Sequence, residues 1–281
     1  MITEFKKLIN KINTDGHESQ PRDLKVRELT LETLALDPSS PFVNYNSRKF
    51  PWKYFAGELA WYLNKDTNVD YINSFSGMWK TLTNPGTNEI NSNYGSLLFG
   101  DQLQWVVDSL KADSNTRQAI AFLNQPKYQF KGNKDFVCTM YLNFFIRDNK
   151  LNMKVQMRSN DIFYGLTFDA PFFAFVHQHV LLWLKDTYPN LELGTYFHSA
   201  DNIHFYEKHF ELAENILKED TTVPQYTMNL VNPLFNIENG ECKLTPEGIS
   251  MINEINKGVD SEFKGSDYYN ILIKYLNINI L

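Results

Sequence analysis

The sequence predicts an α+β fold, in which helices are layered on a β-sheet. Strand-like and helical segments are mixed without strict strand–helix–strand alternation, and one clear β-hairpin stands between strongly apolar helical segments. The chain has 281 residues, of which 43% are hydrophobic, and no Pro/Ser/Gly-rich linker divides it. We therefore expect residues 1–281 to form a single domain.

The first half of the chain contains three helical segments. "MITEFKKLINKIN" has amphipathic spacing and ends near the breaker Asp15-Gly16. The polar stretch "SQPRDLKVRE" follows and places Arg22 on a loop. "WKYFAGELAWYLNKDTN" predicts an aromatic helix with Glu58 beside its apolar stripe, and "DQLQWVVDSLKAD" predicts another helix.

The second half contains the predicted strands. "TRQAIAFLN" predicts one strand, and "FVCTMYLNFFIR", the turn "DNK" and "LNMKVQMRS" predict a hairpin. The first hairpin strand is mostly apolar on both sides, which is typical of a buried central strand. "APFFAFVHQHVLLWLKD" predicts an apolar helix with Pro171 in its first turn, and "TYFHSADNIHFYEKHFELAENIL" predicts a strand followed by a helix.

Composition excludes several classes of protein. The formal net charge of -6 argues against broad binding to nucleic acid, which needs a basic footprint. No run of about 18 apolar residues or signal-peptide core is present, so we expect a cytoplasmic protein without membrane contact. Cys138 and Cys242 are too few for a disulfide framework and lack zinc-site spacing. We expect no metal.

Four residues are candidate phosphate ligands: Arg22, Arg117, Arg158 and Ser159. Arginine offers a fork of donors that suits phosphate oxygens, although each arginine, taken singly, is more simply explained by a surface ion pair. Cys138 is either a small buried hydrophobe or a nucleophile. A nucleophile needs a lowered thiol pKa, and Arg158 is the candidate cation if the hairpin brings it alongside.

Three further positions carry polar groups of interest. His204 and Tyr206 alternate along a strand, so both side chains can face a sugar, or they can be satisfied core residues. Glu58 is a candidate general acid or base, or lies on the wet edge of its helix. Asp169, directly before Ala170 and Pro171, resembles a helix cap, yet it also closes a stretch that begins with Arg158.

A resemblance joins these pieces. "GELAWYLNKDTN", "NSNYG", "TRQAIAFLN", "FVCTMYLNFFIRDNKLNMKVQMRSND", "GLTFD" and "NIHFYEKHF" resemble, in order, the motifs of the thymidylate synthase superfamily. "INSNYG", "FVCT" and "MRSND" look most like its phage deoxycytidylate hydroxymethylases, which make modified DNA precursors. The resemblance implies a large mixed β-sheet packed with helices, a sheet-to-sheet homodimer, and 5,10-methylenetetrahydrofolate as co-substrate.

The resemblance also implies roles for individual residues. Cys138 attacks C6 of the pyrimidine and Glu58 manages protons near the base. Arg158, Ser159 and Arg22 bind the 5′-phosphate, and Arg117 reaches the phosphate of the partner subunit. Gln118 stands where the family usually has a second arginine, which puts one cross-subunit contact in doubt. His204 and Tyr206 hold the deoxyribose, Asp161 holds the pterin, and Trp79 and Tyr94 lie beside the site.

Asp169 stands where a synthase has its base-reading asparagine, and a carboxylate accepts hydrogen bonds from N4 and protonated N3 of cytosine. Thiolate addition at C6 makes C5 nucleophilic toward the one-carbon unit, after which water gives a hydroxymethyl and hydride a methyl product. Thr139 replaces the histidine of the synthases, so we expect water, and hence dCMP hydroxymethylation. Alternatives are a dCMP methyltransferase, a dUMP or CMP hydroxymethylase, a thymidylate synthase, a silent nucleotide-binding protein and, more weakly, a cysteine hydrolase.

Overall fold

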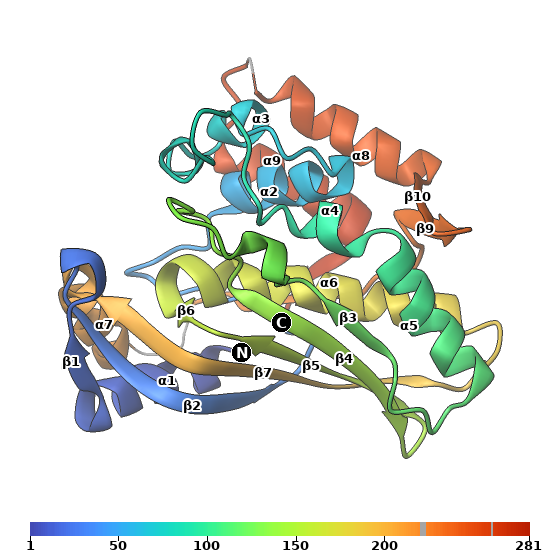
Figure 1. Ribbon diagram of the computed structural model, residues 1–281, viewed down its shortest axis with the longest axis horizontal. Coiled ribbons are helices and arrows are strands. Elements are labelled where there is room, and N and C mark those ends of the chain that lie inside the picture. Colours follow the sequence, from blue (N-terminus) through green and yellow to red (C-terminus); the bar gives the residue numbers. More distant parts are fainter. Residues whose placement is uncertain (220–222, 260) are drawn as a thin grey trace.

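The computed structural model describes residues 1–219, 223–259 and 261–281. Its centre is a mixed sheet with the strand order β1-β2-β7-β5-β4-β3, and β6 pairs with β7 (Figure 1). These strands span His17–Ser19 (β1), Val26–Leu36 (β2), Ile120–Phe122 (β3), Thr139–Arg147 (β4), Lys150–Met157 (β5), Asn160–Asp161 (β6) and Glu192–Tyr206 (β7). The prediction of helices layered on one large mixed sheet is confirmed.

Helices α6 and α5 pack on the sheet: α6 contacts β5 and β7, and α5 contacts β3 and β4. A further layer of α2, α8 and α9 lies beyond α6 in Figure 1. The helices are Ile2–Asp15 (α1), Trp52–Asn64 (α2), Asp70–Asn73 (α3), Tyr94–Leu98 (α4), Asp101–Ala112 (α5), Thr167–Leu184 (α6), Phe210–Lys218 (α7), Pro246–Lys257 (α8) and Gly265–Leu276 (α9). The predicted helices at α1, α2, α5 and α7 are confirmed.

The hairpin of β4 and β5 is confirmed, and its turn is tight. Asp148 and Asn149 both have positive φ, 52° and 58°, which is the conformation of a two-residue turn whose twist matches the strands. Along β5, Leu151, Met153 and Val155 are fully buried, while the alternate residues are partly exposed. The parallel pairing of β5 with β7 then brings the end of the hairpin beside the strand that carries His204.

Three details of the predicted strands are wrong for the single subunit. Within one subunit, strand β4 is not buried on both faces: its residues alternate largely between buried and partly exposed. Cys138 lies directly before β4 rather than inside it. The strand predicted from "TRQAIAFLN" is also shorter and comprises only Ile120–Phe122.

The apolar helix begins earlier than predicted. Asp161 caps a π-helical turn, Ile162–Leu166, by accepting hydrogen bonds from the backbone N–H groups of Phe163 and Tyr164, and α6 continues from this turn. Asp169 is therefore the third residue of α6, and Pro171 the fifth. The tripeptide Asp-Ala-Pro resembled a helix start, but the cap is eight residues upstream.

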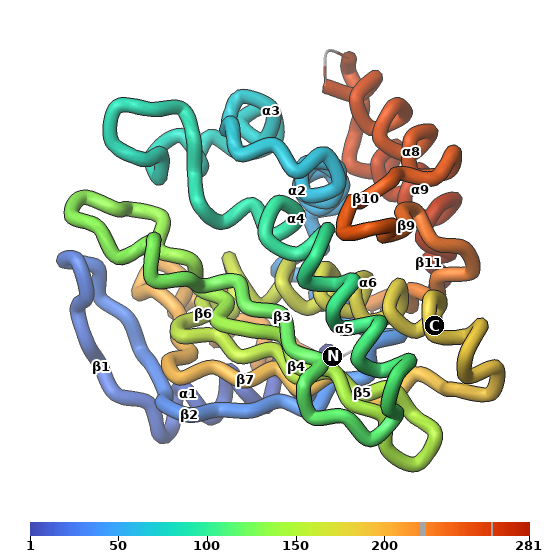
Figure 2. The backbone as a smooth tube through the Cα atoms, turned by 45° about the vertical axis from the view of Figure 1, so that its right-hand side comes forward, coloured from blue at the N-terminus to red at the C-terminus, as the bar shows by residue number. Residues whose placement is uncertain are grey.

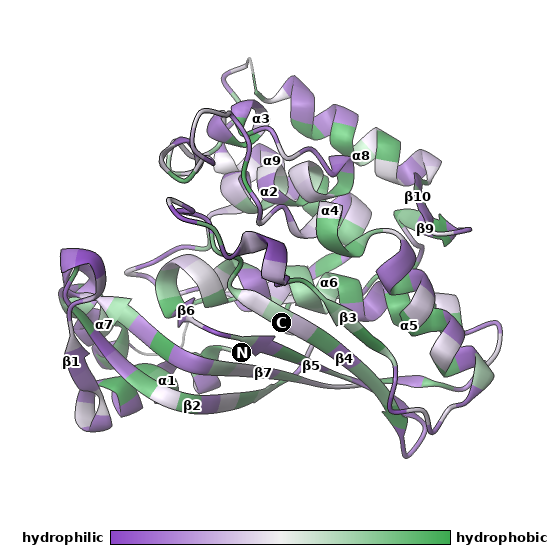
Figure 3. Cartoon of the chain, in the orientation of Figure 1, coloured by the Kyte–Doolittle hydropathy of each residue, from purple (hydrophilic) through white to green (hydrophobic). Residues whose placement is uncertain are grey.

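The C-terminal part of the chain packs against the rest. Helix α9 contacts α2 and α8, and the short strands β11 (Ile278–Ile280) and β8 (Tyr226–Met228) pair with each other, as do β9 (Phe235–Glu238) and β10 (Glu241–Leu244). Green and purple segments alternate along α8 in Figure 3, as expected for a helix with one buried side. Among the described residues, no helix is long and apolar enough to cross a membrane.

Candidate active site

A cavity of about 840 Å³ lies at one end of the sheet. In Figures 1 and 2, the segment between β1 and β2, the loop before α4 and the loop before β4 gather at this end. The cavity is lined by every candidate residue predicted from the sequence except Arg117: Arg22, Glu58, Trp79, Tyr94, Cys138, Arg158, Ser159, Asp161, Asp169, His204 and Tyr206. Residues from distant parts of the chain thus line one cavity.

Cys138 and Arg158 are in contact. The Nη2 atom of Arg158 lies 3.4 Å from Sγ of Cys138, and the backbone N–H of Arg158 donates to the carbonyl oxygen of Cys138. Burial raises the pKa of the Cys138 thiol, and the Arg158 guanidinium offsets only part of this effect. The expected lowering of the Cys138 thiol pKa is therefore not the net result.

Two arginines reach the cavity from different elements. Arg22 lies on an exposed turn with a positive φ of 53°, and Arg158 follows the last residue of β5. Arg158 also donates to the carbonyl oxygens of Phe136 and Val137, which fixes the guanidinium against the two residues before Cys138. Arg117 is exposed on the segment between α5 and β3, outside the cavity of this subunit.

Glu58 lines the cavity and is buried, with 6% of its surface exposed. The alternative that it lies on the wet edge of α2 is therefore wrong. Its Oε1 accepts a hydrogen bond of 2.7 Å from the Tyr54 hydroxyl, which in turn accepts one of 3.0 Å from Nε1 of Trp79. Burial raises the pKa of Glu58 to about 8, and the nearby Asp169 adds to this rise. Glu58 can therefore hold or release a proton near neutral pH.

Asp169 faces the cavity and does not cap α6. Its Oδ2 accepts a hydrogen bond of 2.7 Å from Nδ2 of Asn160, and no backbone N–H at the start of α6 donates to it within the described residues. Burial raises the pKa of Asp169 to about 6, while the hydrogen bond from Asn160 opposes the rise. The helix-cap interpretation is wrong, and the carboxylate is available to a ligand.

Asp161 combines a structural contact with a free atom. Its Oδ1 caps the π-helical turn, whereas its buried Oδ2 has no hydrogen-bond partner in the part of the chain that the structure describes. Burial raises the pKa of Asp161 to about 6. An unpaired buried acceptor that lines a cavity suits a ligand with an N–H donor.

His204 and Tyr206 lie side by side, with ring centroids 5.4 Å apart. Asn202 donates from Nδ2 to Glu28, so its Oδ1 accepts from Nδ1–H of His204 at 2.8 Å. Burial lowers the pKa of His204 to about 4, so the ring is neutral at pH 7. Nδ1 carries the hydrogen, and Nε2 is left as an acceptor that suits a hydroxyl group.

The sequence analysis missed two polar residues that line the cavity. Asn160 stands between two residues that were singled out, so the motif "RSND" contained a signal for it. Asp135 accepts hydrogen bonds from the backbone N–H groups of Asn91 and Ser92 and from the Ser92 hydroxyl, and so ties the loop before α4 to the loop before β4. No local pattern marks Asp135, because its partners lie more than 40 residues away.

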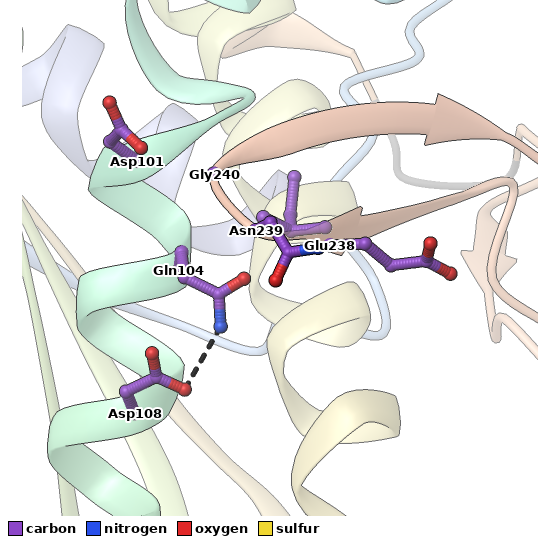
Figure 4. A pocket seen from close by; sticks show the side chains of 7 residues that line it. Asp101, Gln104, Asp108, Glu238, Asn239 and Gly240 are labelled. Atoms are coloured by element: carbon purple, nitrogen blue, oxygen red, sulfur yellow. Dashed lines mark hydrogen bonds between the residues drawn. The ribbon is translucent and has the colours of Figure 1, made fainter.

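A second depression, of about 690 Å³, lies between α5 and the turn that joins β9 to β10 (Figure 4). Gln104 donates to Asp108, and Asp101 and Glu238 also line the depression. Across residues 1–219, 223–259 and 261–281, no three His, Cys, Asp or Glu residues are grouped so that they could hold a metal ion. The polar side chains that line the depression between α5 and the β9–β10 turn are spread apart, so we assign no chemistry to it.

Comparison with known proteins identifies the class. Residues 3–246 match the family model for thymidylate synthase, and the chain belongs to the thymidylate synthase family. Enzymes of this family bind a pyrimidine nucleotide and use methylenetetrahydrofolate. The chain is therefore a one-carbon transferase of the thymidylate synthase type.

Its named relatives have different substrates. The deoxycytidylate 5-hydroxymethyltransferase of Enterobacteria phage T4 is 29% identical over 181 residues, which cover 60% of this chain and 73% of the relative. The deoxyuridylate hydroxymethyltransferase of Bacillus phage SP01 is 35% identical over 122 residues, 42% of this chain and 31% of the relative. The thymidylate synthase of Mycoplasma genitalium is 23% identical over 224 residues, 68% of this chain and 76% of the relative.

Proposed function

We propose that the protein transfers a one-carbon unit from 5,10-methylenetetrahydrofolate to C5 of dCMP and that water completes the reaction to 5-hydroxymethyl-dCMP. The observation that carries the proposal is the carboxylate of Asp169, which lines the same cavity as the Cys138 thiol and is free to accept hydrogen bonds. The relatives from phages T4, T2 and T6 with the name deoxycytidylate 5-hydroxymethyltransferase support it.

In this proposal Cys138 is the nucleophile. Its sulfur adds to C6 of the base, the thiol proton leaves, and C5 becomes electron-rich. Because burial raises the thiol pKa, the thiolate depends on the nearby positive charge of Arg158. Glu58, with a pKa of about 8, takes up or releases protons at the base, and Tyr54 holds its carboxyl in place.

The base and the sugar phosphate occupy opposite parts of the cavity. Asp169 accepts from the N4 amino group and from N3 when it is protonated, a pattern that uracil does not offer. Arg22, Arg158 and Ser159 donate to the phosphate, and His204 and Tyr206 contact the deoxyribose. This assignment is supported by the exposure of Arg22 and the partial exposure of Arg158, in contrast to the burial of Glu58.

The residues present fit a folate. The unpaired Oδ2 of Asp161 suits the N–H groups of a pterin, and Trp79 and Tyr94 give the cavity aromatic walls. When bound, the folate supplies the one-carbon unit at the oxidation level of formaldehyde. Thr139 donates to the sulfur of Met157 and lies in the core, so no imidazole stands directly after the nucleophile, in keeping with water as the final reactant.

The proposal includes a homodimer of single-domain subunits. On the sheet face opposite the core, Tyr141, Phe145 and Phe197 are only partly buried, and Leu31 and Phe122 are 79% and 55% exposed. A partly exposed sheet face that carries several aromatic side chains favours association with a second copy. In such a dimer Arg117, exposed outside its own cavity, reaches the phosphate of the partner subunit.

The test is incubation of the purified protein with methylenetetrahydrofolate and dCMP, dUMP or CMP, with products separated by mass spectrometry. We expect hydroxymethyl product from dCMP. Product from dUMP alone would contradict the cytosine assignment, and a methyl product would contradict the role of water. Tritium release from C5-labelled dCMP, compared with Cys138→Ser, separates an enzyme from a silent nucleotide-binding protein.

A further inference from the structure

A chain of three hydrogen bonds ends on Asp169. Nδ2 of Asn160 lies 2.7 Å from Oδ2 of Asp169, Nε2 of His198 lies 3.1 Å from Oδ1 of Asn160, and the Tyr196 hydroxyl lies 2.7 Å from Nδ1 of His198. Asn160, His198 and Tyr196 expose 3%, 1% and 0% of their surfaces. This series of hydrogen bonds therefore runs from the core to the cavity through side chains that are almost completely buried.

The direction of each hydrogen bond follows from the chemistry of the groups. Oδ1 of Asn160 can only accept, so Nε2 of His198 carries the hydrogen. Burial lowers the pKa of His198 to about 3, so the ring is neutral and its Nδ1 is an acceptor for the Tyr196 hydroxyl. Every bond in the chain thus donates toward Asp169.

A glycine makes room for the last bond. A Cβ atom on Gly165 would lie 2.5 Å from Nδ2 of Asn160 and 3.2 Å from Oδ2 of Asp169. Any larger residue would push the amide away from the carboxylate. The π-helical turn that contains Gly165 therefore contributes to the contact as well as to the start of α6.

We propose that Asn160, held in one orientation by His198 and Tyr196, is a specificity-determining positioning residue that keeps Asp169 as an ionised acceptor and so favours cytosine over uracil. This inference rests on the proposed function and names what sets its base selectivity. The donated N–H stabilises the carboxylate in a site where burial alone favours the protonated form. A protonated Asp169 could donate a hydrogen bond from its O–H group to O4 of uracil.

The main experiment compares kcat/KM for dCMP and dUMP, over a pH series, in the wild type and Asn160→Ala. We expect the dCMP value to fall on the order of 10- to 100-fold, the usual effect of losing a hydrogen bond to a charged group, and the dUMP value to fall less or to rise. The acid limb of the dCMP profile should move to higher pH, because ionisation of Asp169 becomes harder.

Two further variants follow the chain of donors. In Asn160→Asp, the new carboxyl group at position 160 can donate an O–H to Asp169 as long as the two carboxyl groups share one proton. Turnover of dCMP should therefore persist at low pH and fall as the pH rises and that proton is lost. Gly165→Ala should lower the ratio of dCMP to dUMP turnover in the same direction as Asn160→Ala. Thr167→Val is the matched control: it removes a buried hydrogen bond to the Ile162 carbonyl in the same segment without touching Asp169.

Equal losses for dCMP and dUMP in Asn160→Ala, with an unmoved pH profile, would overturn the inference and leave Asn160 a structural residue. The same ratio shift in Thr167→Val would also overturn it. If the wild type turns over neither nucleotide, the proposed function fails, and calorimetric binding of dCMP and dUMP still decides the inference. A dCMP preference that is reduced in Asn160→Ala supports it, and an unchanged preference contradicts it.

Discussion

Replacement of Glu58 by glutamine should stabilise the fold while it removes activity. The native state holds the Glu58 carboxyl in a buried position and raises its pKa from 4.5 to about 8. Between these two values the native state keeps a proton that the unfolded chain releases. The free energy of unfolding therefore falls as the pH rises through this window.

The size of the effect follows from the same pKa values. The penalty grows by about 1.4 kcal/mol for each pH unit above 4.5 and levels off near the native pKa, so the native state loses less than ~1 kcal/mol at pH 5, ~3 kcal/mol at pH 7 and ~4 kcal/mol at pH 8. Glutamine resembles the protonated carboxyl and keeps an oxygen for the Tyr54 hydroxyl. We therefore expect Glu58→Gln to be more stable than the wild type by about these amounts.

The assay is urea unfolding at pH 5, 7 and 8, at one fixed protein concentration because association of subunits also stabilises the fold. Glu192→Gln, which neutralises an exposed carboxylate at the start of β7, is the control and should not show the pH-dependent gain. A stability gain of the same size at pH 5 and pH 8 would refute the reasoning, because the pKa of Glu58 would then be unshifted. Product formation by Glu58→Gln should fall at least 100-fold, the usual contribution of a general acid or base.

Three other changes test the site. Asp169→Asn should move the preference from dCMP toward dUMP, measured as the ratio of kcat/KM values; unchanged dCMP turnover would exclude Asp169 as the base reader. Cys138→Ser should still bind dCMP in a calorimetric titration but release no tritium from C5-labelled dCMP, and residual release at the wild-type rate would exclude Cys138 as the nucleophile. Arg117→Ala should raise the KM for dCMP on the order of 10-fold. Mixing Arg117→Ala subunits with Cys138→Ser subunits should restore activity at low dCMP concentration. In a mixed dimer, one of the two sites then has both Cys138 from its own subunit and Arg117 from the other. No gain on mixing would argue against a contribution across the interface.

Local pattern determined most of the elements. The spacing of apolar residues predicted α2 and α5, and strict alternation predicted β5, because helix and strand periodicities are properties of neighbouring residues. The prediction for β4 was wrong because apolar residues on both sides of a strand can serve a core or an uncovered sheet face, and sequence does not distinguish the two. The cap prediction for Asp169 was wrong because the competing cap, Asp161, lies outside the tripeptide that suggested it.

The sequence by itself determined the family, because the order of the motifs along the chain can be recognised without a structure. The family match over residues 3–246 confirms this prediction. The sequence also named the residues that carry the chemistry, and these roles remain a hypothesis. Only the tertiary structure decided what surrounds those residues. The burial of Glu58 depends on aromatic partners brought together by packing, and the chain of donors behind Asp169 joins Asn160 to His198 across 38 residues. Such contacts set the pKa and the hydrogen-bonding direction of a carboxylate, and they arise only once the strands lie side by side.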